Sequence, residues 1–318
     1  MTLTPIRLTP PPPARHRPAG ALSMGPVLFN WSPDRWRDFH FRIADEAPVD
    51  TVHLGEMVCW KRQPFIAPHL SEVVDRLRAA GKEVVLSSLA LVMSEREREA
   101  MRDLAAGAGD LMVEANDLAI TADLAGRRHA IGPMVNVYNE GTLAFLSRQG
   151  ACRVCLPAEL PARAVGILAA AGLAEIEVQA FGRLPLALSA RCYHARSRSL
   201  HKDGCQYVCA QDPDGMPVDT MDGRPFLTVN GTQTMSSRYV DLLAELAALK
   251  EMGVGRFRLW PQSCDMVAVA HLFRDCLDGR IDPEEAGERL ADLVPEAEFA
   301  NGYIHGREGH ARVAEPLG

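Results

Sequence analysis

The sequence predicts an α/β protein of the (β/α)8 TIM-barrel type, irregular in places, with a cysteine-bearing insertion near its C-terminal third. Two observations predict this fold. From Leu22 onward, short apolar runs alternate with amphipathic helical patterns, which is typical of parallel strands joined by helices. About eight such units in 318 residues favour a closed barrel over an open sheet. Such a barrel presents its functional site at the C-terminal ends of the strands.

The strands are expected where the apolar runs lie, and several of the helices between them begin with recognisable caps. The strands should cover residues 22–31, 50–56, 82–91, 110–116, 130–139, 152–158, 176–182 and 256–262. Serine caps and an early proline mark helix starts, as at Ser32, Pro33 and Ser94. Further helices are expected over residues 70–81, 140–150, 160–172 and 236–253.

Two segments depart from this alternation. Residues 1–20 contain four consecutive prolines and no apolar periodicity, which predicts a disordered extension. Residues 21–318 should then form a single barrel domain. Within that domain the alternation of predicted strands and helices is interrupted over about 183–235, which we interpret as an insertion.

Composition limits the classes of protein that remain. With 47% hydrophobic residues the chain can bury a large core without disulfides. It shows neither the apolar run of a secretory signal nor a stretch long enough to span a membrane, so we expect a cytoplasmic protein with reduced thiols. The net charge of -7, with acidic residues spread along the chain, makes nucleic acid unlikely as the main partner.

The sequence "ARCYHARSRSLHKDGCQYVCA", residues 190–210, places Cys192, Cys205 and Cys209 in one polar segment of the insertion. Clustered thiols in a reducing compartment bind zinc or an iron–sulfur cluster. Either needs a fourth ligand. Cys59 suits this role because it follows a predicted strand at the functional end of the barrel. The remaining cysteines fall in predicted strands or beside an apolar helix, and we interpret Cys152, Cys155, Cys264 and Cys276 as core residues.

The basic residues favour an iron–sulfur cluster over zinc but do not decide between them. Arg191, Arg196, Arg198 and Lys202 lie among the three cysteines, and Lys61 and Arg62 follow Cys59. Such cations offset the negative charge of a thiolate-ligated [4Fe–4S] core, although a zinc tetrathiolate is anionic as well. The paired Cys-x-x-Cys knuckles typical of structural zinc are absent from the sequence.

Polar residues near the predicted strand ends are candidates for lining a substrate cavity. Glu56, Asn136 and Asn230 have such positions, and Gln233 follows in "NGTQTMS". The sequence assigns no general acid or base among them. His53 lies inside a predicted strand and is expected to be a hydrogen-bonded core histidine.

From Leu22 to Gly306 the chain resembles the collagenase-like peptidase family. The segments "GPVLFNW", "LGEMVCWKR", "VVLSSLALV", "GRLPLALSARCYHARS", "KDGCQYVC", "VNGTQTMS" and "NGYIHG" carry the likeness. Two features depart from the family pattern: the proline-rich extension, and Trp60, which stands where a small residue is expected. Neither His-Glu-x-x-His nor Gly-x-Ser-x-Gly occurs, so the residues give peptidase chemistry little support.

Within that family the chain is similar to subunits that hydroxylate the aromatic ring of ubiquinone precursors without O2. The resemblance implies that Cys59, Cys192, Cys205 and Cys209 ligate a [4Fe–4S] cluster. It also implies a heterodimer with a homologous UbiU-like subunit, and a lipid-carrier protein that presents the quinone precursor. A cluster with four cysteine ligands has no open iron, which predicts electron transfer or a structural role. Two alternatives stay open: a zinc- or cluster-stabilised scaffold without its own chemistry, and an RNA-base hydroxylase.

Overall fold

The computed structural model describes residues 20–317. The extension expected over residues 1–20 lies, apart from Gly20, outside the described residues. In the part of the chain that is described, no helix combines the length and the apolar character needed to cross a membrane.

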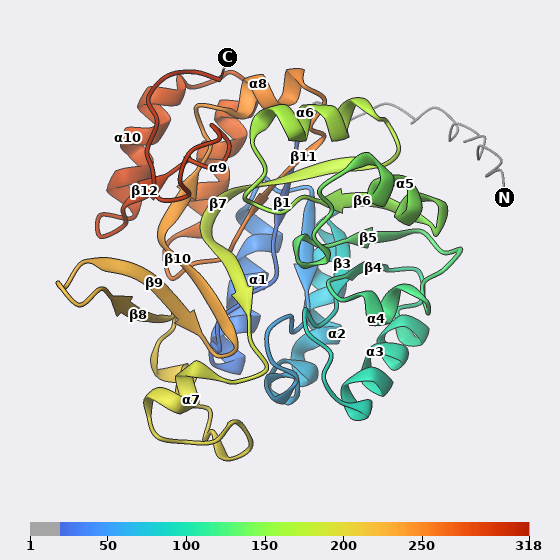
Figure 1. Ribbon diagram of the computed structural model, residues 1–318. Coiled ribbons are helices and arrows are strands. Elements are labelled where there is room, and N and C mark those ends of the chain that lie inside the picture. Colours follow the sequence, from blue (N-terminus) through green and yellow to red (C-terminus); the bar gives the residue numbers. More distant parts are fainter. Residues whose placement is uncertain (1–19, 318) are drawn as a thin grey trace, which may run out of the picture.

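Eight parallel strands close into a barrel at the centre of the molecule (Figure 1). Each of the first seven barrel strands pairs with the next barrel strand along the chain. The eighth, β11, pairs with both β7 and β1, which closes the barrel. The fold class predicted from the sequence is therefore confirmed. The barrel strands are β1 (Ala21–Met24), β2 (Thr51–Leu54), β3 (Glu83–Ser87), β4 (Met112–Ala115), β5 (His129–Ile131), β6 (Ala151–Cys155), β7 (Glu175–Leu188) and β11 (Arg256–Leu259).

Helices lie around the barrel (Figure 1), and local sequence explains where several begin. The Ser32 hydroxyl accepts the N–H of Arg35, with Pro33 in the first turn, and Ser94 caps its helix through Glu97 N–H. The helices of this layer are α1 (Pro33–Glu46), α2 (Gln63–Ala79), α3 (Glu95–Gly107), α4 (Leu118–Thr121), α5 (Glu140–Arg148), α6 (Ala162–Ala170), α8 (Leu246–Glu251), α9 (Met266–Leu277) and α10 (Pro283–Leu293).

The helix predicted over residues 236–253 is partly wrong. Its first part belongs to a strand, β10 (Gln233–Asp241), and only α8 is helical. The reason is a long-range pairing, since β10 lies antiparallel to β7, with Tyr239 opposite Arg183. These cross-strand hydrogen bonds override the helical periodicity of the local sequence.

Strand β7 continues beyond the barrel and begins a separate antiparallel ribbon. Its second half pairs with β10, which pairs in turn with β9 (Pro225–Asn230), and β9 pairs with β8 (Met216–Asp219). The short β12 (Phe299–Ala300) pairs with β10. The loop that carries Cys192, Cys205 and Cys209 follows the end of β7, at the bottom of Figure 1. The ribbon therefore holds this loop at one end of the barrel.

Candidate functional site

The turn after β2 presents Cys59 and is fixed by one buried carboxylate. Glu56 accepts the backbone N–H groups of Val58 at 2.8 Å and Cys59 at 2.9 Å. The turn begins at Gly55, whose φ is +120°, and a Cβ there would lie 2.6 Å from the carbonyl oxygen of Ser87. Cys59 is thus held at the start of the short 3-10 helix η1 (Trp60–Arg62).

The side chain of Arg62, almost completely buried, connects this turn to two other segments. It donates to the carbonyl oxygen of Leu28 over 2.8 Å and to the side-chain oxygen of Asn230 over 3.0 Å. The Asn230 amide in turn donates to the same Leu28 oxygen at 2.7 Å and to Gln233 at 3.3 Å. These bonds fix the β9–β10 turn against the segment that follows β1 and against the Cys59 turn.

Two of the cysteine sulfurs accept N–H groups. Cys192 caps the short helix α7 (Tyr193–Ser197), and its sulfur accepts the N–H of Ala195 at 3.4 Å. The sulfur of Cys209, which is buried, accepts the side-chain amide of Asn30 at the same distance. Donors of this kind stabilise negative charge on sulfur and are typical of thiolate ligands.

Arg62 interacts electrostatically with Cys59, Cys192 and Cys209. Burial acts against the charge of Arg62, but Glu56, Cys209 and Cys59 raise its pKa. Burial raises the pKa of the Cys192 thiol, with Cys209 and Cys205 acting in the same direction and Arg62 against it. Burial also raises the pKa of Cys59, so a metal that binds these thiols must displace protons.

The backbone between Cys205 and Cys209 has an unusual conformation. Cys205 is right-handed helical, whereas Gln206 and Tyr207 have φ values of +49° and +54°. A right-handed residue followed by left-handed ones forms a concave nest of N–H groups, a conformation found at phosphate and iron–sulfur sites. Within residues 20–317, the N–H groups of Gln206 and Tyr207 donate to no backbone acceptor. Left-handed conformations cost free energy in residues other than glycine, so this turn is retained against strain.

The spacing of the sulfurs differs from that of a single-ion site. In the described chain, no three cysteine sulfurs lie within 4.8 Å of one another. Tetrahedral zinc, with Zn–S bonds of about 2.3 Å, brings its sulfurs to about 3.8 Å apart. A [4Fe–4S] core is larger than one ion and spreads its ligands more widely. The donor set and the N–H groups fit such a cluster.

A buried histidine that the sequence analysis did not single out fastens the loop. His194 Nδ1 accepts the N–H of Gly231 at 3.1 Å, which leaves Nε2 to donate to Asp212 over 2.7 Å. Together these bonds connect α7, the β9–β10 turn and the segment after Cys209. The sequence offered only one signal for this role, namely the position of His194 two residues after Cys192.

The candidate cavity residues lie in two places. Glu56, Asn230 and Gln233 are buried and belong to the network around Arg62 and the Cys59 turn. Asn136 ends the 3-10 helix η2 (Pro133–Val135) after β5, in a left-handed conformation, and is not part of that network. A role for any of them in lining a substrate cavity stays a prediction, as does the ligand role of the four cysteines.

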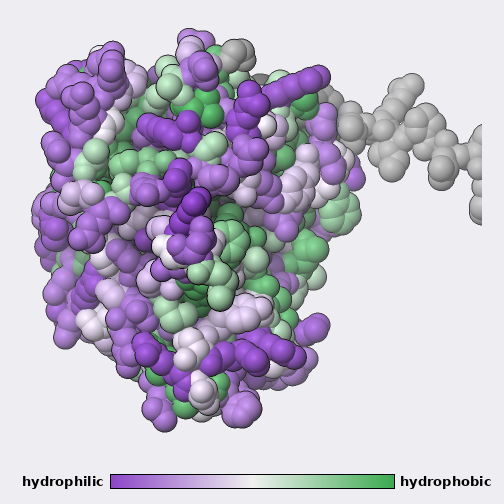
Figure 2. Space-filling view, turned by 60° about the vertical axis from the view of Figure 1, so that its left-hand side comes forward, coloured by the Kyte–Doolittle hydropathy of each residue, from purple (hydrophilic) through white to green (hydrophobic). Residues whose placement is uncertain are grey.

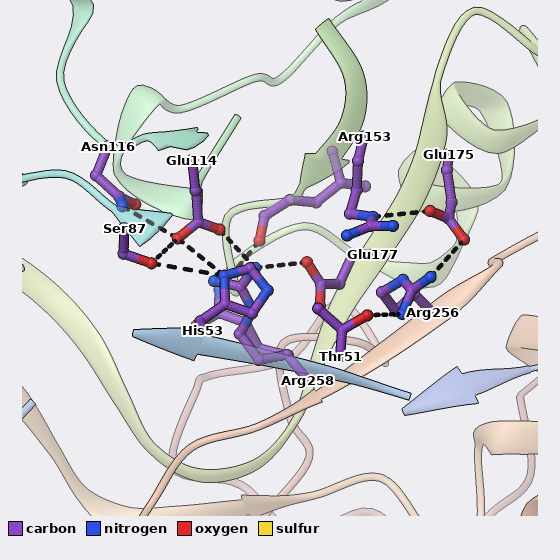
Figure 3. Close-up of polar contacts among 12 residues, drawn as sticks. Thr51, His53, Ser87, Glu114, Asn116, Arg153, Glu175, Glu177, Arg256 and Arg258 are labelled. Carbon is purple, nitrogen blue, oxygen red and sulfur yellow. Dashed lines mark hydrogen bonds and ion pairs between the residues drawn. The ribbon is translucent and has the colours of Figure 1, made fainter. Parts of the chain in front are cut away.

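A second polar cluster fills the interior of the barrel (Figure 3). Arg258 pairs with Glu114 at 2.5 Å and with Glu177 at 2.6 Å, and all three side chains are completely buried. His53 contacts Arg258 at 3.2 Å and Ser87 at 3.5 Å, which agrees with its expected role as a hydrogen-bonded core histidine.

This cluster brings a histidine and two carboxylates within 4.8 Å of one another, an arrangement that could hold a metal ion. Arg258 already occupies the position of the cation. Burial opposes the ionisation of Glu177, but the charge of Arg258 lowers its pKa to about 2. The same guanidinium holds the pKa of Glu114 well below its usual range. We therefore regard the cluster as part of the charged core of the barrel.

The fold and the thiol-bearing loop define a class of protein: a TIM-type barrel whose insertion gathers cysteines at one end. The comparison with known families is specific. The chain matches Peptidase family U32 over residues 38–314. It belongs to this family, the collagenase-like group anticipated from the sequence, which includes O2-independent hydroxylases.

Proposed function

We propose that this chain is the UbiV-type subunit of an O2-independent hydroxylase of ubiquinone precursors. In this proposal Cys59, Cys192, Cys205 and Cys209 hold a [4Fe–4S] cluster. The observation that carries the proposal is that two segments far apart in sequence meet at the β9–β10 turn: Arg62, three residues after Cys59, donates to Asn230, and His194, two residues after Cys192, accepts the N–H of Gly231. Membership of a family that includes such hydroxylases supports it.

When bound, a [4Fe–4S] cluster supplies single-electron transfer. The chain's own residues prepare its site in three ways. Glu56 and Arg62 fix the turn that carries Cys59. The side-chain amide of Asn30 and the N–H of Ala195 donate to cysteine sulfurs. Gln206 and Tyr207, whose φ values are positive, form the nest between Cys205 and Cys209.

The substrate in this proposal is an aromatic ring with a polyprenyl tail, presented by a lipid-carrier protein. A groove of about 650 Å³ lies alongside the ribbon. Its lining combines apolar residues, among them Leu184, Leu186, Phe226 and Leu227, with charged ones such as Arg224, Arg238 and Glu298. Leu186 and Phe226 are 40% and 56% exposed, although large apolar side chains usually avoid water. The partner in the reaction is a homologous UbiU-like subunit.

The test is a measurement of iron, sulfide and zinc on full-length protein purified without oxygen. We expect about four irons and four sulfides per chain, with broad visible absorption. Cys192→Ala should lose most of the iron. Cys276→Ala serves as the matched control, because Cys276 lies in α9 and donates to the carbonyl oxygen of Leu243.

Activity is then measured with the UbiU-like subunit, an acceptor ring and no oxygen. Cys192→Ala should abolish hydroxylation, whereas Cys276→Ala should retain it. Stoichiometric zinc in a colourless protein would overturn the cluster and indicate a scaffold subunit. A full iron complement with no hydroxylation of any ubiquinone precursor would overturn the assigned substrate.

A further inference from the structure

The cysteine loop carries unpaired positive charge on an otherwise acidic chain. Arg191, Arg196 and Arg198 are exposed and Lys202 is partly exposed; together they form what we call the basic patch. The ion pairs of this loop within residues 20–317 are those of Asp203 with Lys61 and of Asp212 with His194. None of the four patch cations is neutralised by a carboxylate in that part of the chain. Figure 2 shows a largely hydrophilic surface at the lower end of the molecule, where Figure 1 places α7.

The basic patch is concave and adjoins the candidate metal centre. Arg191, Arg196 and Lys202 line a hollow of about 540 Å³, and Cys192 forms part of its wall. A molecule seated on the patch therefore lies next to one of the four proposed ligands. Such proximity is what electron exchange with a bound metal centre requires.

The composition of this surface is that of a protein interface. Two exposed aromatic side chains accompany the cations, Tyr193 at 44% and Tyr207 at 38% exposure. Arginine and tyrosine are enriched at protein–protein contacts, where they often dominate the binding energy. The patch spans only residues 191–202, and contacts between redox partners are among the smallest specific interfaces. Opposite charges in such pairs mainly speed the encounter.

We propose that the basic patch docks a small acidic one-electron carrier protein of the flavodoxin or ferredoxin class. The inference rests on the proposed function, because it requires a redox centre at the cysteines. Each transfer would oxidise the carrier by one electron and reduce the metal centre by one, with no bond formed or broken. A redox partner is favoured over nucleic acid because the hollow adjoins Cys192.

The test is a binding titration of the full chain, with and without its UbiU-like partner, against an acidic bacterial flavodoxin at several salt concentrations. We expect binding that weakens steadily with added salt. The triple variant R191E/R196E/R198E should bind more than about tenfold less tightly. R96E/R128E/R148E makes the same change in net charge at exposed positions elsewhere and should bind like the wild type.

The inference would be overturned if both triple variants bound flavodoxin equally, or if the patch bound a short RNA but not flavodoxin. It would also be overturned if the patch variant, unlike the control variant, failed to bind the UbiU-like subunit. Iron content is measured on every sample. A normal iron content without carrier binding refutes the docking site and leaves the proposed function intact. Carrier binding to a chain that never holds iron refutes the proposed function instead.

Discussion

Arg62 and Asn230 form a hydrogen bond of 3.0 Å in the interior of the protein, and this bond joins the turn that carries Cys59 to the ribbon that holds the loop with the other three cysteines. The two residues are far apart in sequence, so their contact exists only in the folded chain. The same guanidinium also holds the carbonyl oxygen of Leu28. It is the structural centre of the candidate site.

Replacement of Arg62 should therefore destabilise the fold as well as the metal centre. In Arg62→Ala the buried oxygens of Asn230 and Leu28 lose a charged donor, and we expect the free energy of unfolding to fall by roughly 3 kcal/mol. Urea denaturation measures this loss, and iron analysis should show incomplete loading. Arg96→Ala, at an exposed position in α3, is the control. A variant with wild-type stability would show that the network does not depend on Arg62.

Loss of the Asn30 amide should change the electronic properties of the site more than its assembly. Asn30 donates to the sulfur of Cys209, and N–H donors raise the reduction potential of a thiolate-ligated cluster. Asn30→Leu should keep its iron but show a more negative midpoint potential in an anaerobic redox titration. An unchanged potential with a full complement of iron would contradict this role.

The left-handed turn at Gln206 offers a paired test of the nest. Gln206→Gly fits φ = +49° without a Cβ, so it should retain iron and lose no more than about 1 kcal/mol of stability. Gln206→Val disfavours the same conformation, because a β-branched side chain rarely adopts it, and should lose most of its iron. Equal iron in both variants would mean that the nest does not contribute to metal binding.

The interior of the barrel should control the acid stability of the protein. Glu114 and Glu177 have lowered pKa values in the folded state, so they stabilise it above their ordinary pKa of 4.5. This stabilisation should disappear as the pH falls from about 4.5 toward 2. Burial, and then the charge of Arg258, lower the pKa of His53, so stability should begin to decline already below pH 6.5.

Arg258→Met should reverse this dependence over part of the range. Without the guanidinium, two buried carboxylates remain uncompensated, at a cost of roughly 3 to 5 kcal/mol near neutral pH. Burial then raises their pKa values, so mild acidification should stabilise the variant while it destabilises the wild type. Thermal unfolding curves from pH 8 to pH 3 would show the difference. Parallel curves would mean that Arg258 does not set these pKa values.

The sequence predicts the barrel well because the buried strands leave short apolar runs between helices. It misses β10, where serine, arginine and tyrosine precede a long apolar periodicity that resembles a helix. The pairing of β10 with β7 decides the structure there, and no local pattern encodes a partner fifty residues away.

The charged interior was also missed, although a signal was present. In "EIEV" and "RFRL", charged residues alternate with apolar ones, as they do in a strand with one face in water. In a closed barrel the apolar residues can face the surrounding helices while the charged residues face one another inside the barrel, as Glu177 and Arg258 do. The choice of face depends on complementary charges that come from distant strands.

Cys192, Cys205 and Cys209 were proposed as ligands from their grouping and Cys59 from its place after a strand, and this role stays a prediction. The residues that fix the surrounding segments were not predicted. Asn30 and His194 act through contacts that only the tertiary structure creates. Arg62 was noted as a nearby charge, and its almost complete burial could not be deduced from the short sequence that contains it.

The division of the cysteines between two distant segments also determines the order in which the protein can mature. Cys192, Cys205 and Cys209 stay near one another even in a nascent chain, whereas Cys59 joins them only after β2 and β7 have become parts of one closed barrel. Under the proposed function, loading with metal would therefore be a late event, carried out on a chain that has already folded. Cells short of iron would then accumulate the folded chain without its metal, and a renewed supply of iron would load it without further protein synthesis.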